Sequence, residues 1–222
     1  MKKVGVFLTV ILLIGCSNKD NTSISNSALY GYVNINLPKI NGMVECSEHP
    51  NVQQITNHYL DNGPVLGYYL NTETYKQIEK LGEINFDNYF MIYGDYQREN
   101  YRALQSDLEI LENSLQQTLF EGDNFEQIST RIDEVYGTIT AGKPALLEKY
   151  SAQPNARTML MLMKYRNETG ETSVISAINF ILVKNRIVNM AFYMAYDGGK
   201  SIDILKERNN DVIDKLMNVN PL

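Results

Sequence analysis

Three strand-like runs occupy the C-terminal third of the chain: Thr158 to Tyr165, Val174 to Lys184 and Ile187 to Tyr196. In the last run alternate positions are apolar or aromatic, which predicts a strand that presents different residues to the two faces of a sheet. Apart from Ser176 and Asn179, the middle run is apolar on both faces, as in a central strand that is covered on both sides. We expect a tight Asn185-Arg186 turn between these two runs.

A final helix is predicted after Gly198-Gly199 breaks the last strand. Ser201 can act as the N-cap of this helix, with Asp203 in its first turn. The helix would close the three-strand meander by burying one apolar stripe, which consists of Ile202, Leu205, Val212 and Leu216.

The middle of the chain has a helical pattern. From Tyr101 to Leu119, mostly leucines recur at spacings of three and four residues, which predicts an amphipathic helix. Asp123 and Glu126 have the spacing of a capping box for a second helix. Pro144 would open a further short helix that runs to Tyr150. We expect these pieces to form a helical hairpin.

The N-terminal half alternates between β-prone and helical segments. Tyr30 to Pro38 and Val65 to Leu70 have the composition of strands. Between them, Pro50 to Tyr59 has the spacing of a short helix, although a strand is also compatible with it. Thr72 to Leu81 predicts another helix, and Phe86 to Tyr93 fits either a strand or the start of a helix.

Together these elements predict an α+β fold with an antiparallel sheet, a C-terminal three-strand meander with a closing helix, and a helical hairpin insertion packed on the sheet. Residues 29–222 would form a single domain that contains the helical segment 98–150. The C-terminal third resembles the PsbP-like superfamily, in which a hairpin around an Asn-Arg or Gly-Arg turn leads into a helix on the sheet. That resemblance implies a binding or assembly protein and carries no catalytic residues to this chain.

The chain begins with Lys2 and Lys3, followed by an apolar run from Val4 to Ile14. This is the pattern of a signal peptide. The apolar run has eleven residues, which is too short for a membrane-spanning helix, because such a helix needs about 20 apolar residues. The run ends in Leu13-Ile14-Gly15-Cys16, which resembles the bacterial lipobox. The resemblance implies that residues 1–15 are removed and that Cys16 carries acyl chains such as palmitate.

Residues 16–28 then form a lipidated cysteine followed by a polar, flexible tether. Two or three acyl chains would hold the protein stably on the membrane, whereas one chain holds only marginally. Ser17 stands where retention of lipoproteins at the inner membrane of enteric bacteria requires aspartate, so in a cell with an outer membrane the resemblance favours the outer membrane over the periplasmic face of the inner membrane. In a Gram-positive cell the protein would lie outside the cytoplasmic membrane instead. A secretory peptide cleaved elsewhere, with Cys16 an ordinary thiol, is the alternative, as is an apolar N-terminal strand.

The net charge of −6 becomes more negative once Lys2 and Lys3 are removed. An acidic body is repelled by phosphate backbones, so we expect no nucleic-acid partner. Cys46 would be the only unmodified thiol in the mature chain, so no intrachain disulfide can form.

The densest polar cluster is Glu45-Cys46-Ser47-Glu48-His49, with His58 nearby. Cysteine, histidine and carboxylate can bind zinc, and a thiol beside a histidine can be an activated nucleophile. The alternative is a turn ahead of Pro50 in which Cys46 packs as a small apolar residue. We favour the second interpretation and therefore predict neither a metal site nor a cofactor.

Four acidic residues could support hydrolysis of a glycan, which requires two carboxylates about 5–10 Å apart. The alternative is a solvated acidic face. The four residues are Asp87, Asp95, Glu99 and Asp107.

The chain has fifteen tyrosines and no tryptophan. Tyrosine combines an apolar ring with a polar tip, which suits a surface that binds protein or sugar, although core packing explains the same residues. Met159, Met161 and Met163 are interpreted as adaptable core residues. The possible binding face consists of Tyr68, Tyr69, Tyr75, Tyr89, Tyr93 and Tyr96.

The sequence has no Gly-x-Ser-x-Gly elbow, Gly-rich phosphate loop, His-Glu-x-x-His or paired Cys-x-x-Cys motif. We therefore expect a lipid-anchored protein of the cell envelope that binds an envelope protein partner or acts as an accessory module, and is not an enzyme. One alternative is a lipoprotein that binds a small molecule or lipid between the methionine-rich sheet face and the leucine stripe. A further alternative is an envelope hydrolase.

Overall fold

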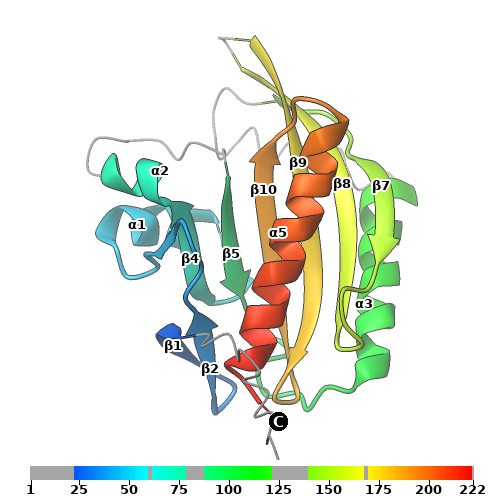
Figure 1. Cartoon of the computed structure of the whole chain (residues 1–222). Helices are drawn as coiled ribbons and strands as arrows, with labels where there is room; N and C mark the ends of the chain where they lie inside the picture. The colour runs from blue at the N-terminus through cyan, green and yellow to red at the C-terminus, as the bar shows by residue number, and fades with distance from the viewer. Residues whose placement is uncertain (1–22, 60–61, 79–87, 122–139, 168–169, 222) are drawn as a thin grey trace, which may run out of the picture.

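The computed structural model describes residues 23–59, 62–78, 88–121, 140–167 and 170–221 (Figure 1). The described helices are α1 (Pro50–Tyr59), α2 (Thr72–Lys76), α3 (Gln105–Gln116) and α5 (Gly199–Asn218), and a π-helical turn, Gln117–Glu121, follows α3. The strands of the N-terminal half are β1 (Ile24–Tyr30), β2 (Val33–Pro38), β3 (Met43–Glu45), β4 (Val65–Asn71) and β5 (Tyr89–Tyr93). Those of the C-terminal half are β6 (Thr140–Ala141), β7 (Ala145–Tyr150), β8 (Ala156–Asn167), β9 (Gly170–Val183) and β10 (Arg186–Ala195).

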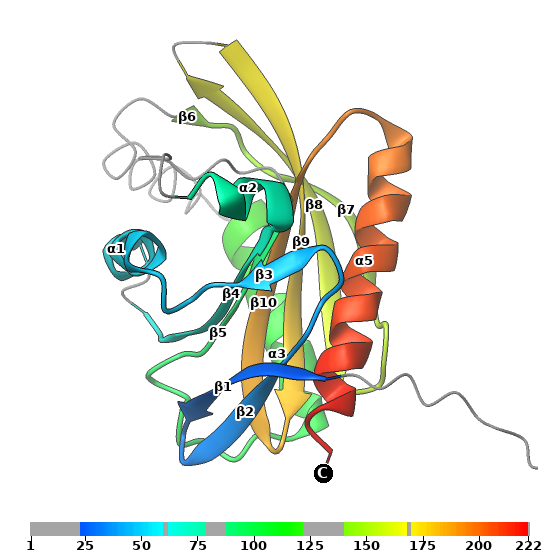
Figure 2. The same cartoon turned by 60° about the vertical axis from the view of Figure 1, so that its left-hand side comes forward.

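Eight of these strands form one antiparallel sheet. Its order is β3-β4-β5-β10-β9-β8-β6, and β7 also pairs with β8 along the same edge. The long strands β8, β9 and β10 form the predicted C-terminal meander. The remaining two strands, β1 and β2, form a separate hairpin at one end of the molecule (Figure 2).

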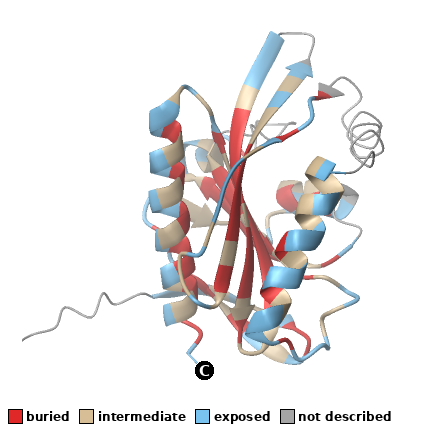
Figure 3. Cartoon of the chain, turned by 90° about the vertical axis from the view of Figure 1, so that its right-hand side faces the viewer, coloured by how far each residue is buried: buried red, intermediate tan, exposed pale blue. Residues whose placement is uncertain are grey.

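Two helices cover opposite faces of the sheet, as Figure 3 shows. On one face, α5 buries Leu205, Val212 and Leu216 against the central strands in the main core. On the other face, α3 buries Leu108 beside Phe180 of β9. Each fully buried apolar side chain of this size stabilises the fold by about 1.5–3 kcal/mol relative to exposure. Coverage on both faces explains why β9 is apolar on both sides.

A smaller apolar cluster lies on the half of the sheet formed by β4 and β5. Tyr68, Leu70 and Tyr89 of these strands pack there with Cys46 and with Val52 of α1. This cluster explains the 3/4 spacing of the segment that precedes β4, and the helix predicted for that segment is confirmed as α1.

A pair of buried asparagines joins α5 to the centre of the sheet. Asn179 Nδ2 donates to Asn209 Oδ1 at 2.8 Å, and Asn209 Nδ2 donates back to Asn179 Oδ1 at 3.0 Å. Asn179 also accepts from the Thr158 hydroxyl at 2.7 Å and donates to the Met190 carbonyl at 3.0 Å. Both asparagines are fully buried, so these bonds satisfy amide groups that would otherwise be costly to bury.

A second polar link holds the β1–β2 hairpin to the end of α5. The side chain of Asn220 makes two hydrogen bonds with the backbone of Asn36: Asn36 N donates to Asn220 Oδ1 at 2.8 Å, and Asn220 Nδ2 donates to Asn36 O at 2.7 Å. Asn36 Nδ2 also donates to the Val219 carbonyl at 2.8 Å. The C-terminal end of the helix and the N-terminal hairpin are thus fixed to one another.

The α+β class, the antiparallel sheet, the C-terminal meander and the closing helix are confirmed. The turn between the last two strands lies one residue earlier than predicted, at Lys184-Asn185, because Val183 pairs with Arg186. Both loop residues have positive φ, 48° and 60°, as a two-residue turn between right-twisted strands requires.

The single strand predicted from Tyr30 to Pro38 is wrong: this stretch spans a hairpin turn. Gly31 and Tyr32 have φ of 52° and 63° and reverse the chain between β1 and β2. A Cβ on Gly31 would lie 1.5 Å from the Glu99 carbonyl oxygen, so the glycine permits a close approach of two backbone segments.

The helix predicted from Pro144 to Tyr150 is wrong, because this segment is the strand β7. A helix of that length is marginal on its own, whereas the edge of β8 offers unpaired backbone groups that β7 satisfies. Within the predicted helical segment 98–150, the described helix is α3, which is followed by its π-helical turn. This helix begins at Gln105, later than the predicted start at Tyr101. The second arm of the predicted hairpin, with its capping box, lies outside the described residues. The helix α2 is shorter than predicted and ends at Lys76.

The asparagine pair makes a stability prediction. We expect Asn209→Ala to lower the free energy of unfolding by roughly 2–4 kcal/mol, because it leaves a cavity and removes hydrogen bonds from buried groups. Asn218→Ala, at an exposed position of the same helix, should change it by less than about 0.5 kcal/mol. Urea unfolding of both variants measures the difference, and equal losses would contradict a special role for the pair.

Candidate functional site

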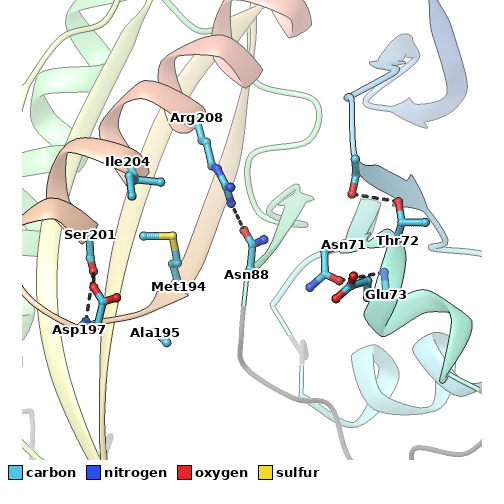
Figure 4. A pocket seen from close by; sticks show the side chains of 11 residues that line it. Asn71, Thr72, Glu73, Asn88, Met194, Ala195, Asp197, Ser201, Ile204 and Arg208 are labelled. Carbon is cyan, nitrogen blue, oxygen red and sulfur yellow. Dashed lines mark hydrogen bonds between the residues drawn. The ribbon is translucent and has the colours of Figure 1, made fainter.

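A pocket of about 620 Å³ opens between α5 and the region where β4 leads into α2. Figure 4 shows its side chains, which come from both sides of the opening. Its lining residues are Gly42, Asn71, Thr72, Glu73, Asn88, Met194, Ala195, Asp197, Ser201, Ile204 and Arg208.

One wall of the pocket is set by the connection from β10 to α5. Ser201 was predicted to be the N-cap, but Gly198, with φ of 134°, occupies that position and Ser201 lies in the first turn. The Ser201 hydroxyl donates to Asp197 Oδ1 and accepts from Asp197 N at 3.1 Å. These bonds hold the aspartate against the start of the helix.

The opposite wall is set by the start of α2. Asn71 caps this helix, because its Oδ1 accepts from the backbone N–H groups of Glu73 at 3.1 Å and Thr74 at 2.9 Å. The cap places Glu73 at the first turn of the helix. Its carboxylate therefore lies on the pocket side opposite Asp197.

Charges of both signs line this pocket. Arg208 Nη1 donates to Asn88 Oδ1 at 2.8 Å, while Glu73 and Asp197 contribute carboxylates. Met194 and Ile204 add apolar surface. The arrangement offers hydrogen-bond donors and acceptors beside an apolar patch, which suits a small polar ligand with an apolar part.

The lining residues of this pocket were not predicted as a site. Arg208 lies on a helix far along the chain from Asn88, and only the tertiary fold brings α5 next to the residue that precedes β5. A residue with positive φ such as Asn88, at 61°, is a feature of the backbone that sequence spacing does not reveal.

Cys46 packs as a small apolar residue, in agreement with the interpretation that we favoured from the sequence. Cys46 is buried, and its Sγ donates to the Tyr68 carbonyl at 3.3 Å. Burial, together with the charge of Glu45, raises the pKa of the Cys46 thiol to about 12. The thiol therefore stays protonated at neutral pH, unlike a zinc ligand or an activated nucleophile. The side chain of His58 lies outside the described residues, and no metal-binding group of three or more His, Cys, Asp or Glu side chains occurs within the described part of the chain.

The carboxylates proposed for glycan hydrolysis serve local structure where they are described. Asp95 Oδ1 accepts from Gln97 N at 2.8 Å, and Asp107 Oδ2 accepts from Leu104 N, also at 2.8 Å, at the start of α3. Glu99 accepts from the side chain of Asn100. Asp87 lies outside the described residues. These contacts account for the three described carboxylates without a substrate.

The six tyrosines of the predicted binding face do not share one surface. Tyr68 and Tyr89 are buried and stacked on one another in the smaller cluster, with ring centroids 5.6 Å apart. Tyr69 is buried in the main core, stacked on Phe90 at 4.2 Å. Alternation along β4 sends Tyr68 and Tyr69 to opposite faces, so the prediction of a common face is not supported. Tyr75 and Tyr93 are half-buried, and Tyr96 is exposed.

The methionines of β8 lie in the interior or at its border, in agreement with their interpretation as core residues. Met159 and Met161 of β8 are buried, and Met163 is half-buried. The helix α3 packs on β8 and β9, with Leu108 fully buried. The pocket described above lies beside the other helix, α5, and not between the methionines and the leucine stripe.

Cys16 and the segment before it lie outside the described residues, so the lipobox stays a prediction. None of the helices in the described ranges is both long and apolar enough to cross a membrane.

No family model matches the sequence, and no curated protein matches it. Among solved structures, a mutant of the protein Mog1 is 12% identical, with 87% of this chain and 94% of that chain covered, at a TM-score of 0.40. The Saccharomyces cerevisiae Ran-binding protein Mog1p is 14% identical, with 88% and 92% covered, at a TM-score of 0.36. These distant likenesses name no family for the chain.

The raised pKa of Cys46 makes a reactivity prediction. At pH 9 about half of the ordinary thiols are ionised, whereas a thiol with a pKa of about 12 is ionised in roughly one molecule in a thousand. In a Cys16→Ala form, we expect a disulfide reagent to modify native Cys46 several hundredfold more slowly than urea-unfolded Cys46 at that pH. Absorbance of the released thiolate measures both rates. A fast native reaction would reopen the nucleophile interpretation.

Proposed function

We propose that this protein is a lipid-anchored component of the bacterial cell envelope that binds a protein partner. One observation carries the proposal: a cationic start and a short apolar run lead directly into Leu13-Ile14-Gly15-Cys16. The outer membrane is the proposed location, because Ser17 replaces the aspartate of the retention signal.

The position of the folded domain supports this proposal. The first strand, β1, begins at Ile24, eight residues after Cys16, so the tether is shorter than the predicted 16–28 and residues 24–28 belong to the β1–β2 hairpin. The intervening residues are polar, apart from the cysteine itself, so they can serve as a tether between a membrane surface and the domain. The domain has its own cores on both faces of the sheet and so does not need the apolar N-terminal run for stability.

The two cysteines provide a matched test of the anchor. We expect a clickable fatty-acid analogue to label the wild-type chain and the Cys46→Ala variant in growing bacteria, and to leave Cys16→Ala unlabelled. Acylated protein should sediment with membranes, because two or more acyl chains hold stably. If the Cys16→Ala variant were still labelled, the lipobox interpretation would be wrong.

The same strains test the binding part of the proposal. In-cell crosslinking followed by affinity purification should recover one dominant envelope protein from wild type. That yield should fall in a Cys16→Ala form exported by the same signal, because the anchor raises the local concentration at the membrane. Recovery of no specific partner from either form would contradict a protein-binding role.

A second candidate function is binding of a small molecule, favoured by the mixed-charge pocket beside α5. A ligand bound to the native state raises the unfolding temperature by mass action. If the pocket is the site, Arg208→Ala should abolish the shift produced by a ligand found in a thermal screen, and Arg166→Ala, which changes an exposed arginine on β8, should preserve it. Preserved shifts in both variants would place the ligand elsewhere.

A further inference from the structure

Exposed tyrosines gather at the end of the molecule where the β1–β2 turn meets the loop between β5 and α3. Tyr32 is 87% exposed, Tyr96 57% and Tyr101 51%. Leu29 and Leu104 are also exposed in the same two segments. We call these five residues the aromatic rim. None of its tyrosines except Tyr96 belongs to the binding face predicted from the sequence.

Tyr32 has a left-handed backbone conformation that bulky residues rarely adopt. Its φ of 63° follows the φ of 52° at Gly31, so both central residues of the two-residue turn are in the left-handed region. Asn and Gly are the residues that such turns prefer, and a bulky side chain there is strained. Strain of this kind gathers at functional positions. The turn thus holds an aromatic ring outward, at a cost that Asn would not incur.

Hydrogen bonds fasten the two segments of the aromatic rim together. The buried Tyr30 hydroxyl donates to the Asp95 carbonyl at 3.1 Å and accepts from the Asp95 N–H at 2.9 Å. Arg186 donates to the carbonyls of Gly31 and Tyr101, each at 2.9 Å. The exposed rings are therefore carried on a fixed base, which lowers the entropy cost of binding a flat surface.

The aromatic rim includes the turn of the hairpin that the tether enters, and the attachment point, Ile24, is at the other end of β1. Ile24 begins β1 opposite Pro38 of β2, and Asn36 of β2 is bonded to Asn220 beyond α5. Figures 1 and 2 place the β1–β2 hairpin, the loop that leads into α3 and the C-terminus at the same end. The tether from Cys16 to Ile24 spans about 16 Å on average, and α5, with its twenty residues, is about 30 Å long. A lipidated chain would therefore hold the hairpin, with the aromatic rim at its turn, within reach of the bilayer.

We infer that the aromatic rim docks the domain on the interfacial region of the lipid bilayer. This inference rests on the proposed lipid anchor, which supplies the proximity. Tyrosine is enriched where membrane meets water, because its ring is apolar and its hydroxyl can stay hydrated. Leu29 and Leu104 add apolar contact beside the rings. The aromatic rim thus binds lipid. The domain then lies against the membrane and does not move freely around its tether.

The chain has no tryptophan, so a single introduced indole reports on one position without background. The test uses the full lipidated protein in phosphatidylcholine vesicles, with and without lipids brominated on their acyl chains. We expect the fluorescence of Tyr32→Trp to shift to the blue and to fall at least twofold with the brominated lipids. Ile204→Trp, at an exposed position near the N-terminal end of α5, should show neither change.

Flotation of the vesicles separates failure of the anchor from failure of the docking surface. If the protein floats and the indole at position 32 is unquenched, the docking inference is wrong and the anchor stands. If the protein does not float, the anchor fails and the docking inference falls with it. If the indole is shielded only after an envelope extract is added, the aromatic rim binds a protein instead of lipid.

A second variant removes the native ring without damaging the fold. Asn tolerates the left-handed conformation, so Tyr32→Asn should preserve or raise the unfolding temperature. Combined with the reporter Tyr101→Trp, it should reduce quenching at position 101 by at least half, because the rim loses a neighbouring contact with the bilayer. Unchanged quenching would overturn a role for Tyr32.

Discussion

The hydrogen-bonded pair of Asn179 and Asn209 is the constraint on which the arrangement of helix and sheet depends. Two amides that are fully buried must satisfy each other, and only one register of α5 on β9 places them face to face. Apolar packing alone tolerates sliding, because leucine and valine contacts are not directional. The asparagine pair therefore selects one position for a helix that is otherwise held by its apolar stripe.

Fixing α5 in this way has consequences at both of its ends. Near its N-terminus, the helix carries Ser201, Ile204 and Arg208 to one side of the mixed-charge pocket. Beyond its C-terminus, Asn220 is bonded to the β1–β2 hairpin, which leads to the strained turn at Tyr32. The mixed-charge pocket thus lies beside the N-terminal half of α5, and the hairpin that carries part of the aromatic rim is bonded beyond its C-terminus.

These two surfaces favour different activities, and their chemistry separates them. The pocket carries charge of both signs beside modest apolar area, as a small polar ligand requires. The aromatic rim is an outward-facing set of tyrosines and leucines, as an interfacial lipid surface requires. The two proposals are compatible, because docking of the aromatic rim on a membrane would leave the pocket beside the N-terminal half of α5 open.

The sequence by itself determined the class of fold and suggested the proposed cellular location of the protein. The apolar runs of β9 and β10, together with the stripe of α5, predicted a covered antiparallel sheet, because the runs are rich in strand-forming residues and the stripe has the period of a helix. The order of charge, apolar run and cysteine at the N-terminus is likewise a local pattern. Buried Asn209 within the stripe of α5 was not recognised, because an asparagine reads as a polar position until its partner on β9 is known.

Only the tertiary structure decided where the surface residues lie. Ala145–Tyr150 became a strand because the edge of β8 supplied hydrogen-bond partners, which no local propensity encodes. Tyr68 and Tyr69 were separated onto two faces by strand alternation, whereas Arg186 joins the backbone of Gly31, which precedes Tyr32, to the backbone of Tyr101. Contacts between residues far apart in the chain determine which tyrosines are exposed, and sequence spacing carries no record of those contacts.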